Sequence, residues 1–256
     1  MKAIKSKIKN VLPRVISYAI LLLNWKIKRL INSIIYAGDE FYCPICSSKI
    51  SAFIINEEGF ADCPICGSGE RHRVDWIFLS KNTNLLNDAH KKMLHVAPEL
   101  FFISKCKKIK NLDYITIDLE DPRAQNKMDI INIKYSADFF DIIYCSHVLE
   151  HVIHDDKAIR EFYRVLKKGG WAVLQVPVTI DKTFENINIT TPEERKRVFG
   201  HEGHVRRCGL DYCDRIRAAA GFITTVYEAN DVLAKDDLKR MGILKKDRYI
   251  FFCTKN

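Results

Sequence analysis

The sequence predicts an α/β fold built on a mostly parallel sheet. The segment 139–178 contains a short apolar strand, an amphipathic helix, a Gly-Gly pair and a second apolar strand, which together form a βαβ unit. The apolar side chains of the helix recur at spacings of three and four residues, at Ile159, Phe162, Tyr163 and Leu166. Both strands are continuously apolar, which is typical of parallel strands covered by helices on both faces.

The ends of this unit indicate where a ligand would bind. Asp155 or Asp156 can cap the start of the helix, and Gly169 with Gly170 supplies a left-handed exit from it. In open α/β sheets, ligands bind beyond the carboxyl ends of the strands. We therefore expect the polar residues after the first strand to lie at the lip of a cleft, namely Ser146, His147, Glu150 and His151.

The net charge of +9 is concentrated at the N-terminus of the 256-residue chain. Residues 1–36 contain eight Lys and Arg residues and no Asp or Glu, which leaves +1 for the other 220 residues. The rest of the chain therefore lacks the basic character that RNA-binding proteins usually carry. The length suits one α/β domain with a small accessory module.

The N-terminal arm, residues 1–38, is predicted to form a basic amphipathic helix, with Lys26, Lys28 and Arg29 opposite an apolar stripe. The stripe consists of Ile27, Leu30, Ile31, Ile34 and Ile35. The helix either packs this stripe on the rest of the protein, lies on an anionic membrane surface, or contacts nucleic acid. Its apolar run is shorter than the roughly 20 residues that span a bilayer. Without a secretory cleavage site, we expect a cytoplasmic protein, at the inner face of the membrane if the helix binds lipid.

Two Cys-Pro-Ile-Cys pairs predict a structural zinc site within residues 39–70. The four thiols belong to Cys43, Cys46, Cys63 and Cys66. Four thiolates complete a closed tetrahedral shell around Zn²⁺, and the segment between the pairs is typical of a β-hairpin, as in a zinc ribbon. The alternative is disulfides or redox Cys-x-x-Cys sites, but the other five cysteines show no pairing pattern, which favours a reduced protein. A helix within 71–90 would link the ribbon to a domain over 91–256.

The strings DIIYCSHVLEHV and RVLKKGG, followed by a strand ending in Val-Pro, resemble motifs of the class I S-adenosylmethionine-dependent methyltransferases. The likeness is greatest to the branch that includes small-molecule and quinone O-methyltransferases, and it extends from about Lys92 to the C-terminus. It implies a Rossmann-like fold with a mostly parallel seven-stranded sheet. It also implies S-adenosylmethionine as cofactor and a reversed hairpin at the sheet edge, formed by segments 222–227 and 249–253.

The first strand of the implied cofactor site, 93–97, departs from the family pattern. Methyltransferases usually carry a glycine-rich loop at its end, where this chain has Ala97, Pro98 and Glu99. The strand is similar to an L-H-x-A-P-E strand of zinc-ribbon methyltransferases, so His95, Ala97 and Glu99 are expected to line the cofactor. Glu99 would then face the ammonium group of the cofactor. The alternative is a domain that does not bind the cofactor.

The next strands add further candidate cofactor-binding residues. Asp118 lies 20 residues beyond Pro98, at the spacing at which an acid binds ribose hydroxyls; otherwise it caps the next helix. By resemblance, Asp129 would accept a hydrogen bond from the adenine amino group and Ile130 would pack on the ring; otherwise Asp129 is a loop residue. Ser146 completes the predicted set.

Methyl transfer to a hydroxyl requires a base that removes the proton of the acceptor, and a histidine suits that role. We expect His147, directly after a strand, to point toward the methyl group, and His151 to share a helix face with it. Both are candidate catalytic residues, and Glu150 is expected to contact substrate. The alternatives are packing on the cofactor, a structural role, or an H-x-x-E-H metal pair, for which other metalloprotease signs are lacking.

The segment after the fifth strand is dense in polar and cationic residues and is expected to fold over the cleft. Thr191, Pro192 and Glu194 form a capping box for a short helix. His204 and Arg206 are predicted to contact substrate, unless the segment is an exposed surface loop. Arginines here would suit an anionic acceptor such as a glycan or lipid intermediate.

The sequence therefore predicts a methyltransferase that acts on an O or N atom of a small molecule or of a glycan- or lipid-linked intermediate. One alternative is an RNA methyltransferase with a zinc-ribbon recognition module. Another is a non-catalytic scaffold with a degenerate methyltransferase fold.

Overall fold

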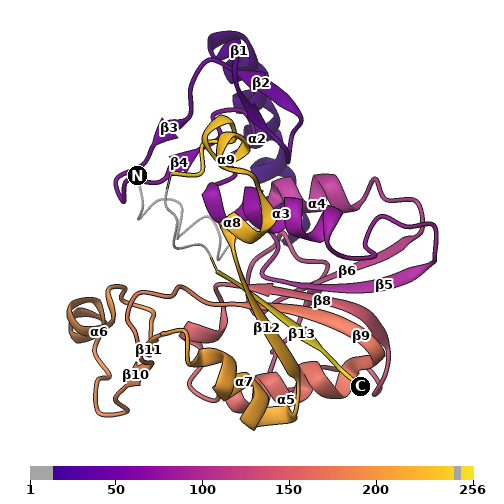
Figure 1. Ribbon diagram of the computed structural model, residues 1–256, viewed down its shortest axis with the longest axis vertical. Helices are drawn as coiled ribbons and strands as arrows, with labels where there is room; N and C mark the ends of the chain where they lie inside the picture. Colours follow the sequence, from indigo (N-terminus) through magenta and orange to yellow (C-terminus); the bar gives the residue numbers. More distant parts are fainter. Residues whose placement is uncertain (1–13, 245–248) are drawn as a thin grey trace.

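The computed structural model describes residues 14–244 and 249–256, which fold around one seven-stranded sheet with helices on both faces (Figure 1). The strands are β5 (Lys91–Val96), β6 (Leu112–Asp118), β7 (Asn126–Lys127), β8 (Phe140–Ser146), β9 (Leu166–Gln175), β12 (Ile223–Glu228) and β13 (Tyr249–Thr254). Their order across the sheet is β12-β13-β9-β8-β5-β6-β7. Only β13 runs in the direction opposite to the other six strands. The predicted mostly parallel sheet with a reversed edge hairpin is confirmed.

The strand order reverses at β5, which pairs with β6 on one side and with β8 on the other. Such a switch point is where open α/β sheets bind ligands, beyond the carboxyl ends of the strands. The helices α3 (Glu70–Lys81) and α4 (Leu100–Cys106) cover one face of the sheet, and α5 (Asp155–Val165) and α7 (Tyr212–Ala220) cover the other (Figure 1).

Each face of the sheet has its own apolar core, because successive side chains of a strand point to opposite faces. In β5, Met93 joins the core beneath α3 and α4, whereas Leu94 joins the core beneath α5 and α7. The predicted stripe of α5 is buried at Ile159 and Phe162. Leu166 is buried as well, but it begins β9, since α5 ends at Val165.

A zinc-ribbon-like module lies on the α3 and α4 side of the sheet (Figure 1). It consists of two antiparallel pairs, β1 (Ala37–Cys43) with β2 (Ser48–Ile50) and β3 (Ile54–Ile55) with β4 (Ala61–Asp62). Two short C-terminal helices, α8 (Ala229–Val232) and α9 (Lys235–Arg240), return to this side of the sheet, where α9 packs beside β1.

Arg73 connects the module to the rest of the chain. Its fully buried guanidinium donates to the carbonyl oxygens of Ala61 at 2.8 Å and Ser68 at 2.6 Å in the module. It also donates to those of Met241 at 2.7 Å and Gly242 at 2.8 Å after α9. Because these partners lie far apart in the chain, the module and the C-terminal segment are held to α3 by one side chain.

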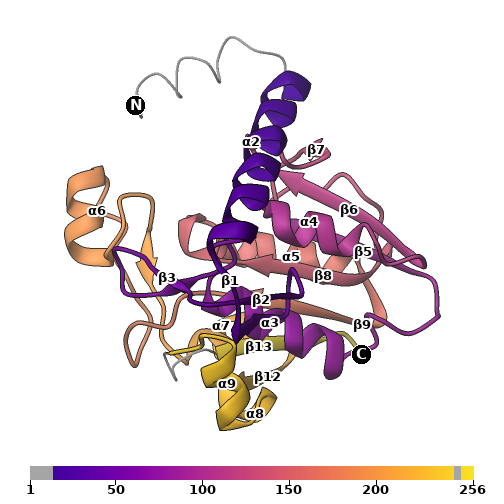
Figure 2. The same ribbon diagram turned by 90° about the horizontal axis from the view of Figure 1, so that it is seen from above.

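Helix α2 (Arg14–Ile35) precedes the module, and its N-terminal end projects past the edge of the sheet in Figure 2. It is attached by hydrogen bonds from Trp25 Nε1 to the Cys66 carbonyl oxygen, at 3.0 Å, and from Asn32 to that of Pro64. The five residues of the predicted stripe, however, are 48–75% exposed. The expectation that the stripe packs on the protein is therefore wrong. Lys2, Lys5, Lys7 and Lys9 lie outside the described residues.

No described helix is long and apolar enough to cross a membrane.

After β9, the chain forms an extension made of β10 (Phe184–Glu185), α6 (Pro192–Phe199) and β11 (Arg206–Arg207). Figure 1 shows this extension beyond one end of the sheet. It meets the turn after β8, where η1 (Leu149–His151) is a short 3₁₀ helix.

Candidate active site

Three predicted residues lie side by side at the carboxyl edge of the sheet. Val96 of β5 pairs with Ile117 of β6 and with Cys145 of β8. The residues that follow these three in the chain, Ala97, Asp118 and Ser146, are therefore level with one another. The parallel register thus brings together candidate groups from three separate segments of the sequence.

The backbone turns sharply where β5 and β8 end. Ala97 has a φ of 52° and His147 a φ of 56°, both in the left-handed region that glycine enters most easily. Each conformation is held by a backbone hydrogen bond: Ala97 N–H donates to the Ile117 oxygen and His147 N–H to the Gln175 oxygen, both at 2.9 Å. Ala97 therefore adopts the conformation expected of the glycine that it replaces.

Glu99 lies between two imidazoles beside this corner. Its carboxylate is 3.2 Å from Nε2 of His72 and 3.4 Å from Nε2 of His95. Burial lowers the pKa of His72 to about 4, so this ring is neutral, and its Nδ1 accepts from the Gly69 N–H at 3.0 Å. Burial acts to raise the pKa of Glu99, but donation from the two imidazoles outweighs it and holds this pKa well below its ordinary value. Glu99 is therefore a fixed negative charge.

His95 has a different setting from the predicted one. The ring is fully buried, with Nδ1 2.6 Å from the Tyr114 hydroxyl and Nε2 facing Glu99. Nδ1 is thus hydrogen-bonded within the protein, and Nε2 lies beside the Glu99 carboxylate. His95 therefore orients Glu99, and the sequence pattern gave no sign of Tyr114 as a partner of His95 or of His72 as a partner of Glu99.

The two candidate nucleoside-binding acids follow β6 and β7. Oδ1 of Asp118 accepts from the N–H groups of Glu120 at 2.7 Å and Asp121 at 2.6 Å, which fixes the carboxylate and leaves Oδ2 for another donor. Oδ1 of Asp129 accepts from the Ile131 N–H at 3.1 Å, and Asp129 is exposed. Ile130 is buried in the core beneath α5.

The turn after β8 carries an imidazole–carboxylate pair. Nδ1 of His147 lies 3.4 Å from Oε1 of Glu150, whose side chain is 1% exposed. Burial acts to raise the pKa of Glu150, but the contact with His147 outweighs it and the pKa is lowered. The expectation that His147 and His151 share a helix face is wrong, because His147 has left-handed backbone and η1 begins only at Leu149.

A layer of buried polar groups lies beneath this edge, and sequence reasoning missed it. The Tyr144 hydroxyl donates to Oδ2 of Asp75 at 2.6 Å, and burial raises the pKa of Asp75 to about 7. Four buried polar atoms, two on α3 and two at the ends of β8 and β9, have no hydrogen-bond partner in the described part of the chain: Arg71 Nε, Asp75 Oδ1, Ser146 Oγ and Gln175 Oε1. Such orphaned groups are costly unless a ligand satisfies them. They fit a polar group such as the amino-acid end of S-adenosylmethionine.

The signal for Asp75 was present in the sequence. It stands inside the run Val74 to Leu79, where every other residue is apolar, and an acid in such a run is a candidate buried group. The apolar residues of this run, Val74, Ile77 and Phe78, are buried in the core beneath α3 and α4.

The extension after β9 is fixed to the turn after β8. Thr191 caps α6 by accepting from the Glu194 N–H at 3.3 Å, as predicted. Arg206 is 2% exposed and donates through Nη1 to the carbonyl oxygens of Leu149 and Val152, both at 2.7 Å. The expected cationic substrate contact is replaced by a buried clamp, because these carbonyl groups need donors. Arg207 is likewise engaged, with the carbonyl oxygen of Thr179.

His204 lies in the loop before Arg206, next to His151, with ring centroids 4.7 Å apart. Burial lowers the pKa of His204. Both rings are accessible, since His204 is half-buried and His151 is exposed. These two predicted residues are therefore brought together at the lip, although 53 positions separate them in the sequence.

The four cysteines of the N-terminal module converge on one point. Their sulfur atoms all lie within 4.8 Å of one another, with 3.8 Å between Cys43 and Cys66 and between Cys46 and Cys63. The two pairs form equivalent knuckles, in which the N–H of Ser47 and the N–H of Gly67 each donate to the first cysteine's carbonyl oxygen at 2.8 Å. All nine cysteines of the chain are free thiols. The cluster fits a tetrahedral metal ion.

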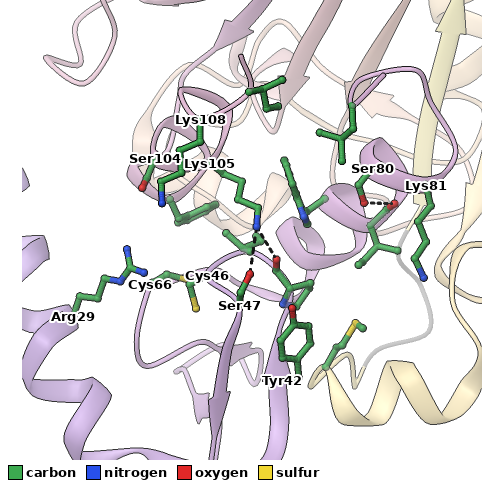
Figure 3. A pocket seen from close by; sticks show the side chains of 18 of the residues that line it. Arg29, Tyr42, Cys46, Ser47, Cys66, Ser80, Lys81, Ser104, Lys105 and Lys108 are labelled. Atoms are coloured by element: carbon green, nitrogen blue, oxygen red, sulfur yellow. Dashed lines mark hydrogen bonds between the residues drawn. The ribbon is translucent and has the colours of Figure 1, made fainter. Parts of the chain in front are cut away.

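A cavity of about 760 Å³ opens beside this cluster, between α2, the module and α4 (Figure 3). Its described lining includes four cationic side chains and no acidic one: Arg29, Lys81, Lys105 and Lys108. Figure 3 shows Arg29 near Cys66 and Lys105 near Ser47. The cavity lies on the α4 side of the sheet, away from the carboxyl edge.

A family model described as a methyltransferase domain matches residues 66–174. The match begins in the second cysteine knuckle and ends within β9, so it includes α3 and the whole candidate edge. No curated protein matches the chain in sequence.

Several solved structures are similar to this chain. An S-adenosylmethionine-dependent methyltransferase from Mesorhizobium loti is 13% identical, with a TM-score of 0.51, over 70% of this chain and 97% of that one. One from Archaeoglobus fulgidus is 15% identical, with a TM-score of 0.49, over 74% and 95%. A putative methyltransferase from Bacillus halodurans is 16% identical, with a TM-score of 0.39, over 68% and 93%.

Proposed function

Because the chain belongs to the class I S-adenosylmethionine-dependent methyltransferases, we propose that it methylates an oxygen or nitrogen atom of a small molecule or of a glycan- or lipid-linked intermediate. The observation that carries the proposal is the pairing of His147 with the buried Glu150, next to the strained corner at Ala97. The acids Glu99, Asp118 and Glu150 lie along the carboxyl edge of the sheet. The imidazole of His147 would face the acceptor.

Bound S-adenosylmethionine would supply the electrophilic methyl group. Asp118, with one oxygen fixed by backbone donors, would bind the ribose hydroxyls through the other, and Glu99 would pair with the ammonium group. Asp129 and Ile130 would contact the adenine, and Ala97 and Ser146 would contact the amino-acid part. The small Cβ of Ala97 lets the backbone approach the ligand closely.

His147 would take the proton of the acceptor through Nε2, since Nδ1 faces Glu150. The carboxylate of Glu150 would stabilise the imidazolium that forms, in the manner of a base oriented by a buried acid. Glu150 is nearly inaccessible to solvent, so its contribution would be through His147. His151 and His204, at the lip, would contact the acceptor.

The four-cysteine cluster would hold a structural Zn²⁺ ion. Its shell would have four thiolates and a net charge of −2, and the surrounding side chains complement that charge. Arg73, Arg29 and Lys105 all lie around the cluster. Because the shell is closed, the ion would stabilise the module without entering the reaction.

The exposed stripe of α2 would lie on an anionic membrane surface. The stripe is apolar, and Lys26, Lys28 and Arg29 border it, which is the arrangement of helices that bind at a lipid interface. Cosedimentation with vesicles of phosphatidylglycerol and phosphatidylcholine tests this contact. We expect Leu30→Asp with Ile34→Asp to abolish binding and Ser33→Asp, outside the stripe, to retain it. Equal binding by both variants would contradict the proposal.

The reaction is tested by incubating cell extract with the protein and S-adenosylmethionine labelled in its methyl group. We expect label in an organic-soluble or sugar fraction that survives ribonuclease, and its loss in His147→Asn but not in His154→Asn. Asparagine tolerates left-handed backbone, so His147→Asn keeps the turn. Label that ribonuclease releases would instead support the RNA methyltransferase alternative.

A further inference from the structure

Three imidazoles from two segments meet at the lip of the cleft. His151 lies in η1, and His201 and His204 lie in the loop between α6 and β11. One ring nitrogen of each lies within 4.8 Å of the others. The ring centroid of His204 is 4.7 Å from that of His151 and 4.8 Å from that of His201.

We propose that His151, His201 and His204 bind a divalent transition-metal ion such as Zn²⁺, at a site distinct from the four-cysteine cluster. The described residues supply three imidazoles and no fourth ligand to this group, which leaves a coordination position open, as in catalytic zinc sites. Imidazole also suits such metals better than Mg²⁺ or Ca²⁺, which prefer oxygen ligands. Zinc–nitrogen bonds of about 2.0–2.1 Å would draw the nitrogens together by roughly 1 Å.

The hydrogen bonding of His151 prepares it as a ligand. Its Nδ1 lies 3.0 Å from the carbonyl oxygen of Gly203, which can only accept, so Nδ1 carries the proton. The lone pair of Nε2 is therefore free for a metal. A ring N–H that donates to a backbone carbonyl is the usual way in which ligating histidines are oriented.

The loop that carries the other two histidines is fixed against η1. The Val205 N–H donates to the backbone carbonyl oxygen of Glu150 at 2.9 Å, and Arg206 donates to the carbonyl oxygens of Leu149 and Val152. Gly203 sits so close that an added Cβ would lie 2.9 Å from Nδ1 of His151. The hydrogen bonds and close packing between the loop and η1 therefore bring the three rings together.

His201 is the least prepared of the three ligands. Its Nδ1 accepts from the Gly203 N–H at 3.0 Å, which places the ring proton on Nε2. Metal binding requires His201 to release this bond or to change tautomer. We therefore expect His201→Ala to weaken metal binding less than His151→Ala or His204→Ala.

The open position would face the acceptor, an inference that rests on the proposed function. An acceptor that bears a carboxylate or hydroxyl could supply the next ligand through oxygen. The metal would then orient the acceptor, and His147 would take its proton. The substrate class narrows to acceptors with an oxygen ligand near the methylated atom.

Co²⁺ added to the full-length protein with its four-cysteine site loaded with Zn²⁺ tests the site. We expect a second metal equivalent by elemental analysis and a visible spectrum without thiolate-to-metal bands. His151→Ala and His204→Ala should lower Co²⁺ affinity at least 100-fold, whereas His154→Ala, an exposed neighbour, should leave it unchanged. Gly203→Ala should also lower it, since it displaces His151 without removing a ligand.

The proposal is overturned if the wild-type protein takes up no second equivalent, or if the two ligand variants bind Co²⁺ as the wild type does. Far-ultraviolet circular dichroism identifies variants that fail to fold, and Gly203→Ala keeps the test decisive in that case. Metal uptake is measured without methyl transfer, so an inactive protein that still binds Co²⁺ contradicts the proposed function and not the metal site.

Discussion

Ala97 and His147 follow neighbouring parallel strands, and both adopt left-handed backbone, with φ values of 52° and 56°. Left-handed backbone costs a residue with a Cβ about 1–2 kcal/mol, and such strain persists only where the surrounding structure imposes it. Two such residues at one edge mark the point where the sheet must leave room for a ligand. The missing glycine after β5 therefore does not argue against cofactor binding.

Replacing Ala97 tests this interpretation directly. Ala97→Gly should keep cofactor affinity and change the free energy of unfolding by less than about 1 kcal/mol, because relief of strain offsets the added backbone entropy. Ala97→Val should lose cofactor binding and destabilise the protein by about 2 kcal/mol or more, since a β-branched residue fits left-handed backbone poorly. Calorimetric titration and thermal unfolding measure both. Normal cofactor affinity in Ala97→Val would show that the corner does not contact the ligand.

The βαβ unit over β8, α5 and β9 could be predicted because its signals are local. Apolar periodicity and the acids at the helix start lie within one short segment. The glycine pair, expected to end the helix, instead lies inside β9, because α5 passes directly into the strand after Val165. The sheet order followed from the family resemblance. Hydrogen bonds that join distant segments could not be predicted in this way: Tyr144 and Asp75 are 69 positions apart, and His151 and the Gly203 carbonyl are 52 apart.

The same limit explains the errors at the lip. Spacing placed His147 and His151 on one helix face, but spacing says nothing of a left-handed residue that delays the helix by two positions. Arg206 was expected to contact substrate because it lies in a polar, cationic segment after the fifth strand. Its burial depends on carbonyl groups of the turn after β8, whose orientation only the folded chain defines.

Removing Asp118, the acid proposed to bind the ribose, should weaken cofactor binding. Asp118→Ala is expected to lower affinity roughly 10- to 100-fold, since hydrogen bonds to charged groups contribute about 1.5–3 kcal/mol. Asp113→Ala, an acid near the start of the same strand β6, is the matched control. Calorimetric titration with S-adenosylmethionine measures the difference. Unchanged affinity in Asp118→Ala would mean that another residue binds the ribose.

Metal removal should unfold the N-terminal module and destabilise the whole chain, because Arg73 joins the module to α3 and to the segment after α9. We expect chelation under denaturing stress to lower the melting temperature, and Cys46→Ser to do the same without chelator. Cys213→Ser, which changes a partly exposed thiol outside the cluster, is the control. A protein that keeps its melting temperature after its zinc has been removed would contradict the structural role.

The buried acid Asp75 should make stability fall with rising pH. Its pKa is raised by burial from 3.8 to about 7, so between these values the unfolded chain releases the proton and the folded chain retains it. Rising pH therefore stabilises the unfolded state relative to the folded state. The free energy of unfolding should fall by up to about 4 kcal/mol across this window relative to Asp75→Asn.

Comparing the wild type with Asp75→Asn at each pH removes the contribution of other groups. His72 acts in the opposite direction: its pKa is lowered by burial from 6.5 to about 4, so its contribution to stability is lost as the pH falls through that window. Denaturant unfolding from pH 4 to pH 8 measures the difference curve. A flat difference between the two proteins would show that Asp75 ionises normally in the fold.

The clamp formed by Arg206 leads to a prediction that separates positioning from substrate contact. Arg206 reaches the turn after β8, and it also lies 3.3 Å from Asp155, an acid that is fully buried against Arg215 and Tyr212. Arg206→Lys retains the charge but loses the planar array of donors, so the loop with His201 and His204 should loosen. We expect methyl transfer to fall at least tenfold while cofactor affinity is unchanged, because the proposed cofactor residues lie at the ends of β5, β6, β7 and β8 and not in this loop. Hydrogen exchange of residues 201–206 in the absence of substrate should rise in Arg206→Lys and stay at the wild-type level in Arg195→Lys, on α6 outside the clamp. Faster exchange without substrate would identify a positioning residue, whereas a loss of acceptor affinity with unchanged exchange would restore Arg206 as a direct substrate contact.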